Sequence, residues 1–353
     1  MKKMLENSEV HIQKKKIITL ALLLAFLSIF YVVISYMESK EVFSTGSKLE
    51  KTIENMEIYL GGEAAGIKLL STGVLVIENE QNNGIEVGDV ILEIGGNVIE
   101  TNTELQNYVQ EYKDSEISLK IDRNGDTIIQ KIKSVYSQGN KKYELGLWVK
   151  DSSAGVGTIS FYDKISGRFA ALGHGITETS DNVVFPISTG GLVKTSITNI
   201  KRGENNFPGD MRGTLYKEVI GQIRKNTING IYGNIEIKTY YEGKEAIQVT
   251  PKIDIKEGKA IIYCTLLDNK VHEYEIEVTK VLYGSKGNKN MMIRITDEEL
   301  LKQTGGIIQG MSGSPIVQNG KLIGVVTHVF LNDPTQGYGV FIENMIEDMS
   351  IME

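Results

Sequence analysis

The pattern of apolar and polar residues separates one long apolar run near the start of the chain from many short apolar segments after it. Residues 17–37 read IITLALLLAFLSIFYVVISYM and contain no charged side chain. A helix of this length spans about 30 Å, which is the hydrocarbon thickness of a bilayer. The pattern therefore predicts a transmembrane helix at 17–37.

The charges on either side of this run predict its orientation. Five lysines precede it, at positions 2, 3, 14, 15 and 16, whereas mixed charges follow it. The positive-inside rule then makes residues 1–16 a cytoplasmic tail and places everything after residue 37 outside the cytoplasm. The run is longer than the apolar core of a signal peptide, and no A-x-A-like cleavage site follows it. We therefore expect an uncleaved anchor in a single-pass membrane protein.

Two regions follow the anchor before the long C-terminal part of the chain. Residues 38–54 mix Ser, Thr, Gly, Lys and Glu without apolar periodicity, which predicts a linker. From 55 to 136 the chain gives short apolar stretches bounded by Gly, Asn or Asp, as strands are. These residues therefore predict a small β-rich domain.

One helix interrupts the strands of this small domain. Leu105, Tyr108, Val109 and Tyr112 recur at i, i+3, i+4 and i+7, which predicts an amphipathic helix. Two pairs could form the capping box at its start, namely Thr101 with Glu104 or Thr103 with Gln106.

The C-terminal residues 140–353 carry short apolar segments with period-2 alternation and breaks rich in Gly or Asn. This pattern is typical of a β sandwich or barrel. The dipeptide Asn319-Gly320 between two such segments predicts a tight hairpin. Helical signals are weak except at 297–303, where acidic residues fill a first turn.

The composition of the chain limits the kinds of partner and site that it is expected to have. The chain has 38 Lys and Arg against 45 Asp and Glu, a net charge of −7, so nucleic acid is not an expected partner. Glycine is frequent, at 37 residues, and proline scarce, at five, which favours tight turns between short strands. A single cysteine and four histidines argue against a disulfide framework, a metal site or a metal cofactor. We expect Cys264 to pack as a small buried hydrophobe.

Two short strings carry candidate chemistry. His174 lies in ALGHGI, where flanking glycines free the imidazole at the end of an apolar strand. Ser312 lies in GMSGSPI, a turn of small residues that suits a nucleophile, because its backbone N–H groups can converge on an oxyanion. Taken singly, a Gly-x-Ser-Gly turn is more often an ordinary hairpin entry, and a lone histidine is more often structural.

The stretch GIEVGDVILEIGG at 84–96 resembles the signature of PDZ domains of bacterial membrane-associated proteases. The resemblance implies that 55–136 is a PDZ domain, with a small sandwich as the alternative. The family's carboxylate-binding loop matches Gly66, Ile67, Lys68 and Leu69. It further implies that a peptide C-terminus, or the chain's own linker, adds to a sheet edge beside the helix.

The string GMSGSPI parallels the Gly-Asp-Ser-Gly-Gly-Pro loop of chymotrypsin-like peptidases, and the tract QGMSGSPIVQNGKLIGVVTHVFLNDPTQGYGVFIENM resembles the stage IV sporulation protein B family. Supporting segments are LGHGI, FPGDMRG, NTINGIYG, YEIEVTKV and ITDEELLKQTGG. The resemblance implies a mainly β protein with a transmembrane helix, a PDZ domain and a trypsin-like double β-barrel at 140–353. The resemblance also implies a peptidase that needs no cofactor.

The same resemblance implies a function. Members are membrane-anchored serine endopeptidases that act in the intermembrane space of the developing spore. They cleave a membrane-bound regulator of an intramembrane protease, and themselves, and so signal late sigma-factor activation during endospore formation. Two alternatives are a quality-control PDZ protease, which usually carries its PDZ domain after the protease domain, and an inactive PDZ scaffold.

Carried over residue by residue, the family's catalytic groups fall on His174 as base, Ser312 as nucleophile and Asp297 as the acid that orients the imidazole. Gly310 and Ser312 would supply the oxyanion N–H groups. His328 follows the nucleophile on a strand that borders the specificity pocket in trypsin-like folds, which suggests a substrate contact. Four other aspartates in the interval are alternatives to Asp297, and these are Asp181, Asp210, Asp254 and Asp268.

Overall fold

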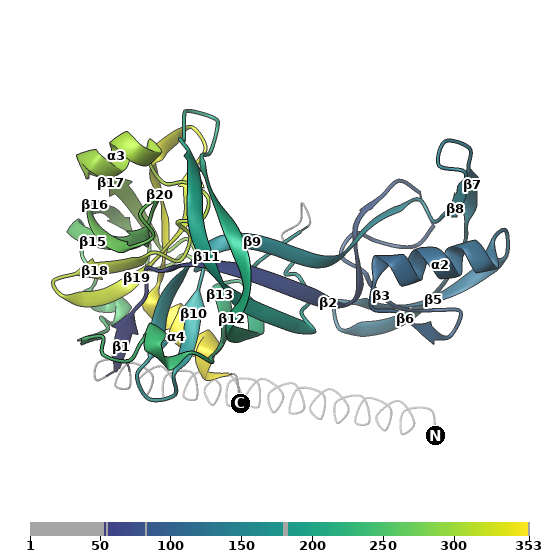
Figure 1. Ribbon diagram of the computed structural model, residues 1–353, viewed down its shortest axis with the longest axis horizontal. Helices are drawn as coiled ribbons and strands as arrows, with labels where there is room; N and C mark the ends of the chain where they lie inside the picture. Colours follow the sequence, from purple (N-terminus) through teal and green to yellow (C-terminus); the bar gives the residue numbers. More distant parts are fainter. Residues whose placement is uncertain (1–52, 54–55, 82, 179–182, 352–353) are drawn as a thin grey trace, which may run out of the picture. The chain divides into compact units, whose positions relative to one another are not determined.

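The computed structural model describes residues 53, 56–81, 83–178 and 183–351 (Figure 1). The transmembrane helix predicted at 17–37 and nearly all of the predicted linker lie outside the described residues. Within the described part of the chain, none of the helices has the length and apolar character needed to cross a bilayer. Contacts divide the chain into residues 1–55 and Met56–Glu353.

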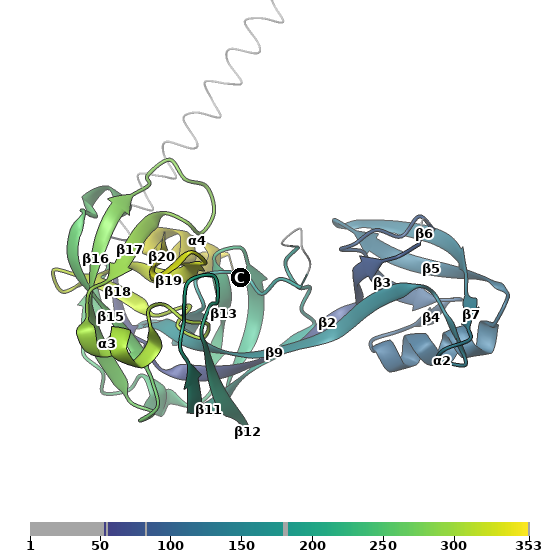
Figure 2. The same ribbon diagram turned by 90° about the horizontal axis from the view of Figure 1, so that it is seen from above.

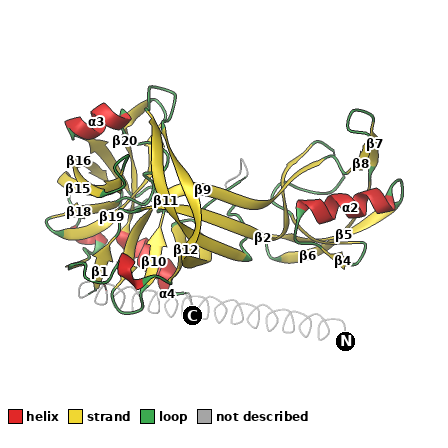
Figure 3. Ribbon diagram, viewed as in Figure 1, coloured by secondary structure: helices red, strands yellow, loops and turns green. Residues whose placement is uncertain are grey.

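Strands make up most of the second unit, so the prediction of a mainly β protein is confirmed (Figure 3). Six strands form a first closed ring, because β9 pairs with both β10 and β2. In ring order they are β2 (Ala64–Asn79), β9 (Leu147–Asp163), β10 (Arg168–Ala171), β13 (Gly230–Ile235), β12 (Asp210–Thr227) and β11 (Thr189–Lys201). Alternate apolar residues such as Ile159, Phe169 and Ile231 fill its core.

Six further strands close into a second barrel. In ring order they are β15 (Gly258–Thr265), β16 (Val271–Val281), β17 (Met291–Ile295), β20 (Asp333–Phe341), β19 (Lys321–Phe330) and β18 (Pro315–Gln318). Cys264 is fully buried in its core, as expected. Asn319 and Gly320, with φ of 52° and 76°, form the predicted tight hairpin between β18 and β19.

Short elements complete these two barrels. Strands β1 (Glu57–Leu60) and β14 (Ala246–Gln248) extend the first sheet beyond β9. The helices are α3 (Glu298–Thr304) and α4 (Ile342–Ser350), with 3-10 turns η1 (Lys238–Tyr240) and η2 (Lys252–Asp254). Helix α3 starts one residue after the predicted start at 297, because Asp297 is its N-cap.

The PDZ region consists of a small sheet and one helix. Its elements are β3 (Val90–Ile94), β4 (Asn97–Val98), α2 (Asn102–Tyr112), β5 (Glu116–Arg123) and β6 (Asp126–Lys133), followed by the hairpin of β7 (Val135–Ser137) and β8 (Lys142–Glu144). The capping box of α2 is Thr101 with Glu104, the first of the two predicted pairs. Leu105 and Val109 are buried, which confirms the predicted apolar face of the helix.

Strands β2 and β9 belong to both the PDZ sheet and the first barrel, and they run side by side in both views (Figures 1 and 2). The first half of β2 pairs with β9 and β11, whereas residues 74–79 pair with β3 and β9. Residues 57–70, which fall inside the predicted PDZ range, therefore contribute strands to the barrel sheet. Strand β2 is thus shared between the barrel sheet and the PDZ sheet.

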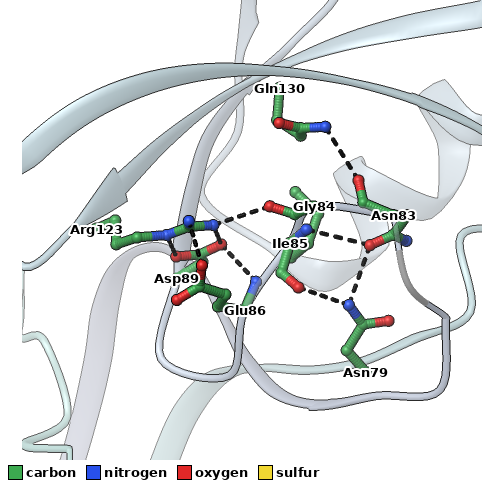
Figure 4. A network of polar contacts seen from close by, with 8 residues as sticks. All are labelled: Asn79, Asn83, Gly84, Ile85, Glu86, Asp89, Arg123 and Gln130. Carbon is green, nitrogen blue, oxygen red and sulfur yellow. Dashed lines mark hydrogen bonds and ion pairs between the residues drawn. The ribbon is translucent and has the colours of Figure 1, made fainter.

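A buried ion pair holds the loop between β2 and β3 (Figure 4). Asp89 is 1% exposed, and both of its carboxylate oxygens accept hydrogen bonds from Arg123 at 2.7 Å. Arg123 also donates to the carbonyl oxygen of Gly84 at 2.9 Å and pairs with Glu86. Residues 84–89, the first part of the stretch that carries the PDZ resemblance, thus form a structural loop that one guanidinium group fixes to β5.

Candidate active site

A cavity of about 900 Å³ is lined by residues from both barrels. His174, Gly310, Ser312 and His328 all line it, so the structure brings together four of the residues predicted for catalysis and substrate contact. His174 follows β10 of the first barrel, whereas Ser312 precedes β18 and His328 lies in β19 of the second. The site therefore depends on the docking of the two barrels.

The backbone around His174 fixes its position. Leu172 and Gly173 both have left-handed φ, of 71° and 68°, and a Cβ on Gly173 would lie 2.4 Å from the side chain of Val325. The Nδ1 atom of His174 lies 2.8 Å from the carbonyl oxygen of Gly175. Since a carbonyl can only accept, Nδ1 carries the proton and Nε2 keeps its lone pair.

The electrostatic environment also prepares His174 to act as a base. Burial lowers the pKa of His174 below its usual 6.5, and the hydrogen bond to Gly175 opposes this only in part. The imidazole is therefore neutral at pH 7, with its free lone pair on Nε2. This is the state that a general base requires.

Ser312 lies in a tight turn with left-handed glycines at 310 and 313, where φ is 100° and 97°. Its hydroxyl donates to the carbonyl oxygen of Thr327 at 2.8 Å. Thr158 of β9 holds the turn from the other barrel, because its N–H donates to the carbonyl of Ser312 at 3.1 Å and its hydroxyl to that of Gly310 at 2.8 Å. No sequence motif marks Thr158 or Thr327; only their burial, at 1% and 2%, distinguishes them.

Two backbone donors of this turn are free. The N–H groups of Met311 and Gly313 donate to the carbonyls of Ile308 and Val326, at 3.1 and 2.8 Å. The N–H groups of Gly310 and Ser312, in contrast, have no acceptor among the described residues, and both residues line the cavity. An oxyanion formed at Ser312 could be stabilised by this pair of donors.

Ser314 lies two residues after Ser312 but in a different environment. It is fully buried, its hydroxyl has no hydrogen-bond partner, and it does not line the cavity. A substrate in the cavity therefore meets the Ser312 hydroxyl and not that of Ser314.

His328 faces the same cavity beside His174. The centroids of the two rings lie 5.0 Å apart, and the Nδ1 atom of His328 is buried without a hydrogen-bond partner. Burial and the neighbouring His174 lower the pKa of His328 to about 4. A neutral imidazole at this position can contact a substrate without repelling the histidine that acts as base.

The structure does not place Asp297 in this site. Its side chain accepts hydrogen bonds from the N–H of Leu300 at 2.9 Å and of Glu275 at 3.4 Å, so it is the N-cap of α3. It lines a separate pocket beside His272 and not the cavity that holds His174. The expectation that Asp297 orients the imidazole is therefore corrected: a helix cap uses the same carboxylate oxygens that a triad would need.

The other candidate acids do not take this role either. Asp210 pairs with Arg212, Asp268 pairs with His272, and Asp254 lies in η2. Asp181 lies outside the described residues. Across the described ranges, no carboxylate is hydrogen-bonded to a ring nitrogen of His174, and no cluster of His, Cys, Asp and Glu could hold a metal ion. The backbone carbonyl of Gly175 takes the orienting position that was predicted for an acid.

The predicted carboxylate-binding loop is also corrected. Gly66, Ile67, Lys68 and Leu69 lie in the first half of β2, paired with β9 on one edge and β11 on the other. Strand pairing thus occupies both edges of this segment, which leaves no room for an added peptide strand. Ile67 instead lines the active-site cavity. Local sequence could not reveal this, because β9 and β11 are remote along the chain.

Comparisons with known proteins bear on both regions. A family model described as SpoIVB peptidase S55 matches residues 141–346, and a model described as PDZ domain matches residues 60–133. A search of curated proteins gave no match.

Solved structures similar to this chain include proteases and an isolated PDZ domain. The PDZ domain of an SdrC-like protein from Listeria monocytogenes is 19% identical, with a TM-score of 0.21, over 22% of this chain and 87% of that one. The HtrA-type protease AlgW with a decapeptide is 9% identical, with a TM-score of 0.36, over 83% and 65%. The active form of the Rv3671c protease from M. tuberculosis is 12% identical, with a TM-score of 0.33, over 55% and 72%.

Proposed function

This chain belongs to the SpoIVB peptidase S55 family and carries a PDZ domain, so it is a PDZ-containing serine peptidase, and we propose that it is an endopeptidase that uses Ser312 and His174. The observation that carries this assignment is the free N–H pair of Gly310 and Ser312 at the nucleophile, in one cavity with a neutral histidine. An inactive scaffold has no need of unpaired backbone donors that line a cavity at this turn.

The proposed reaction starts with the Ser312 hydroxyl leaving the Thr327 carbonyl and turning to the Nε2 atom of His174. The Ser312 oxygen attacks the peptide carbonyl while His174 takes its proton, and the oxyanion is stabilised by the N–H groups of Gly310 and Ser312. His174 then returns the proton to the leaving amine, and water hydrolyses the acyl-enzyme by the same steps. The Gly175 carbonyl accepts from Nδ1–H throughout and so keeps Nε2 directed at the serine.

The lining of the cavity supports an apolar substrate side chain beside the scissile bond. Among its described residues are Ile67, Val156, Ile307, Ile308 and Val329, and the lining holds no Asp or Glu. The one lysine of the lining, Lys289, would repel a basic substrate side chain. A pocket for Arg or Lys would need a carboxylate.

We further propose the cellular role that the family suggests. Residues 17–37 anchor the chain, with residues 1–16 in the cytoplasm and the catalytic part in the intermembrane space of the developing spore. There the enzyme cleaves a membrane-bound regulator of an intramembrane protease, and itself, and so signals late sigma-factor activation during endospore formation. Family membership and the uncharged apolar run support this role.

Covalent labelling tests the chemistry. A fluorophosphonate should label the full-length chain on Ser312, and His174→Ala should slow labelling at least about 10²-fold, since the general base is lost. Labelling that maps to another serine, or no labelling of a folded chain, would show that the chain is a scaffold or uses a different nucleophile.

A cellular experiment tests the role. In sporulating cells that carry Ser312→Ala, we expect the full-length chain and uncleaved membrane regulator to accumulate, and late sigma-factor activity to be lost. A cysteine introduced near Ser312 should react with a membrane-impermeant reagent only from the extracytoplasmic side. Reaction from the cytoplasm alone would overturn the proposed topology.

A further inference from the structure

One lysine in the wall of the catalytic cavity has no anionic partner. Lys289 belongs to the loop of residues 282–290 between β16 and β17, and it lines the cavity together with His328 and Tyr338. Among the described residues no carboxylate pairs with its ammonium group, and the described lining holds no Asp or Glu. A cleft whose only charges have one sign attracts ligand groups of the opposite sign.

Hydrogen bonds fix the backbone of the loop that carries Lys289. The Asn288 side-chain amide donates to the carbonyl oxygen of Ile228 in the first barrel at 2.7 Å. The Asn344 amide of α4 donates to the carbonyl oxygen of Gly287 at 3.2 Å. The two residues before Lys289 are therefore attached to the first barrel and to α4, so the position of the lysine backbone is set before a substrate binds.

The same loop is connected to the nucleophile. The Thr327 hydroxyl donates to the carbonyl oxygen of Asn288 at 3.1 Å, and the Thr327 carbonyl accepts from the Ser312 hydroxyl at 2.8 Å. Lys289 thus follows a residue that Thr327 joins to Ser312. Because Lys289 and Ser312 also line one cavity of about 900 Å³, a peptide that is cleaved at Ser312 can reach Lys289.

An aromatic ring supports the lysine side chain. The Nζ atom of Lys289 lies 5.4 Å from the centroid of the Tyr338 ring, which is within the range of a cation–π contact. The Tyr338 ring packs in turn against Phe330, with the two centroids 4.7 Å apart. A cation–π contact uses no hydrogen-bond acceptor, so the three N–H donors of the ammonium group stay available to a carboxylate.

The charge of Lys289 already acts on the site. Burial, His174 and Lys289 together lower the pKa of His328 to about 4, so the lysine lies close enough for its field to reach that imidazole. Both cavity histidines are neutral at pH 7, because the pKa of His174 is also lowered. Lys289 is then the only charged side chain in the described lining, and it attracts an acidic substrate side chain while it repels a basic one.

We propose that Lys289 is a specificity-determining residue that binds a glutamate or aspartate side chain of the substrate, in the part of the cavity beside His328 and Tyr338. The carboxylate accepts hydrogen bonds from the Lys289 ammonium group, and the methylene groups of the acidic residue lie against the Tyr338 ring. This inference rests on the proposed peptidase function. It adds an acidic substrate residue to the apolar one expected beside the scissile bond.

Binding is measured on the full-length Ser312→Ala chain in detergent, so that the result does not depend on turnover. The probes are octapeptides of alternating Ser and Val with an uncharged dye at the N-terminus and an amide at the C-terminus, in which one residue at a time is replaced by Glu or by Gln. At one position we expect Glu to bind about threefold or more tighter than Gln. Equal binding at every position would overturn the acidic subsite, while fluorophosphonate labelling decides the peptidase function independently.

Charge reversal identifies the residue that binds the acid. In Lys289→Glu the preference for Glu over Gln should be lost, and a peptide with Lys at the same position should bind best. Lys286→Glu makes the same charge change in the same loop, at a residue that does not line the cavity, and should keep the Glu preference. Equal preferences in the two variants would show that another group binds the acid. A gain by a free C-terminal carboxylate alone, lost in Lys289→Glu, would assign Lys289 to a chain end and overturn the side-chain subsite.

The preference should also appear in catalysis and depend on salt. For the unsubstituted chain, kcat/KM of the best Glu peptide should exceed that of its Gln counterpart about threefold at low salt. Because Lys289 is exposed, the ratio should fall close to 1 in about 1 M NaCl, where the Debye length is about 3 Å. Lys289→Met, which removes the charge, should give a ratio close to 1 at both salt concentrations. A ratio that salt leaves unchanged would mean that neutral hydrogen bonds recognise the acid, and the role of Lys289 would be wrong.

Discussion

Ser312 and Ser314 are two residues apart in one turn, yet only Ser312 reaches the cavity. We expect Ser312→Ala to lower kcat/KM for an apolar peptide substrate by at least about 10³-fold, because the nucleophile is removed. Ser314→Ala removes a buried hydroxyl without a partner and should change kcat/KM less than about threefold. Steady-state kinetics on both variants checks this, and the reverse order of effects would make Ser314 the nucleophile.

At the residue scale, substitutions of Asp297 distinguish the role of a helix cap from that of a triad acid. Asn caps a helix about as well as Asp, whereas Ala does not. We therefore expect Asp297→Asn to leave both kcat/KM and stability nearly unchanged, and Asp297→Ala to lower the free energy of unfolding by about 1 kcal/mol. Denaturant unfolding and kinetics on the two variants provide the measurement. A loss of about 10⁴-fold in Asp297→Asn would restore the residue to the triad.

The two cavity histidines predict a pH dependence. Burial lowers the pKa of both below 6.5, and that of His328 to about 4, so the folded protein resists their protonation while the unfolded chain accepts it. Stability should therefore fall as the pH drops from about 6.5 toward 4. The acid limb of kcat/KM should have its midpoint below 6.5, where His174 becomes charged.

One variant and one pH profile assign these effects to the two histidines. His328→Gln should reduce the slope of unfolding free energy against pH between 6.5 and 4, measured by denaturant unfolding. Glutamine does not titrate, so the unfolded chain no longer gains the proton that the folded protein keeps off His328. A kcat/KM midpoint at or above 6.5 would contradict the neutral buried state of His174.

At the scale of elements, the PDZ loop between β2 and β3 depends on one ion pair with β5. Arg123→Ala would leave the carboxylate of Asp89, which is 1% exposed, without its guanidinium partner. We expect a loss of about 2 kcal/mol in unfolding free energy, less than for a fully buried pair because Arg123 is partly exposed. Lys131→Ala breaks an exposed pair with Glu116 and should change stability by less than about 0.5 kcal/mol. Equal effects of the two variants would show that the Asp89 pair has no special role.

At the scale of the whole molecule, the barrel sheet needs strands from both ends of the PDZ region. A fragment of residues 140–353 lacks β1 and all of β2, which leaves β9 and β11 without the strand that lies between them. We expect this fragment to be unfolded or aggregated, by circular dichroism and gel filtration, since it exposes two long strand edges. A fragment of residues 56–353 should fold cooperatively. If the 140–353 fragment folded on its own, the claim that β2 is needed to close the barrel would be wrong.

Local sequence was enough to predict the features that depend on a few neighbouring residues. These include the capping box at Thr101 and Glu104, the hairpin at Asn319 and Gly320, the apolar face of α2, and the His and Ser strings that line the cavity. Caps, tight turns and helix faces arise from interactions within about four residues, so a short window carries enough information to predict them.

The pairing of distant segments, in contrast, became visible in the three-dimensional fold. Leu69 reads as part of a binding loop in its own window, but Ser153 and Gly190 come to its two sides and make it the interior of a sheet. In sequence Asp297 is the preferred triad acid with a helix start as the alternative, but in the structure it caps α3 and lines a pocket beside His272. Strand partners and free N–H groups depend on contacts between residues far apart along the chain, and no local pattern records those contacts.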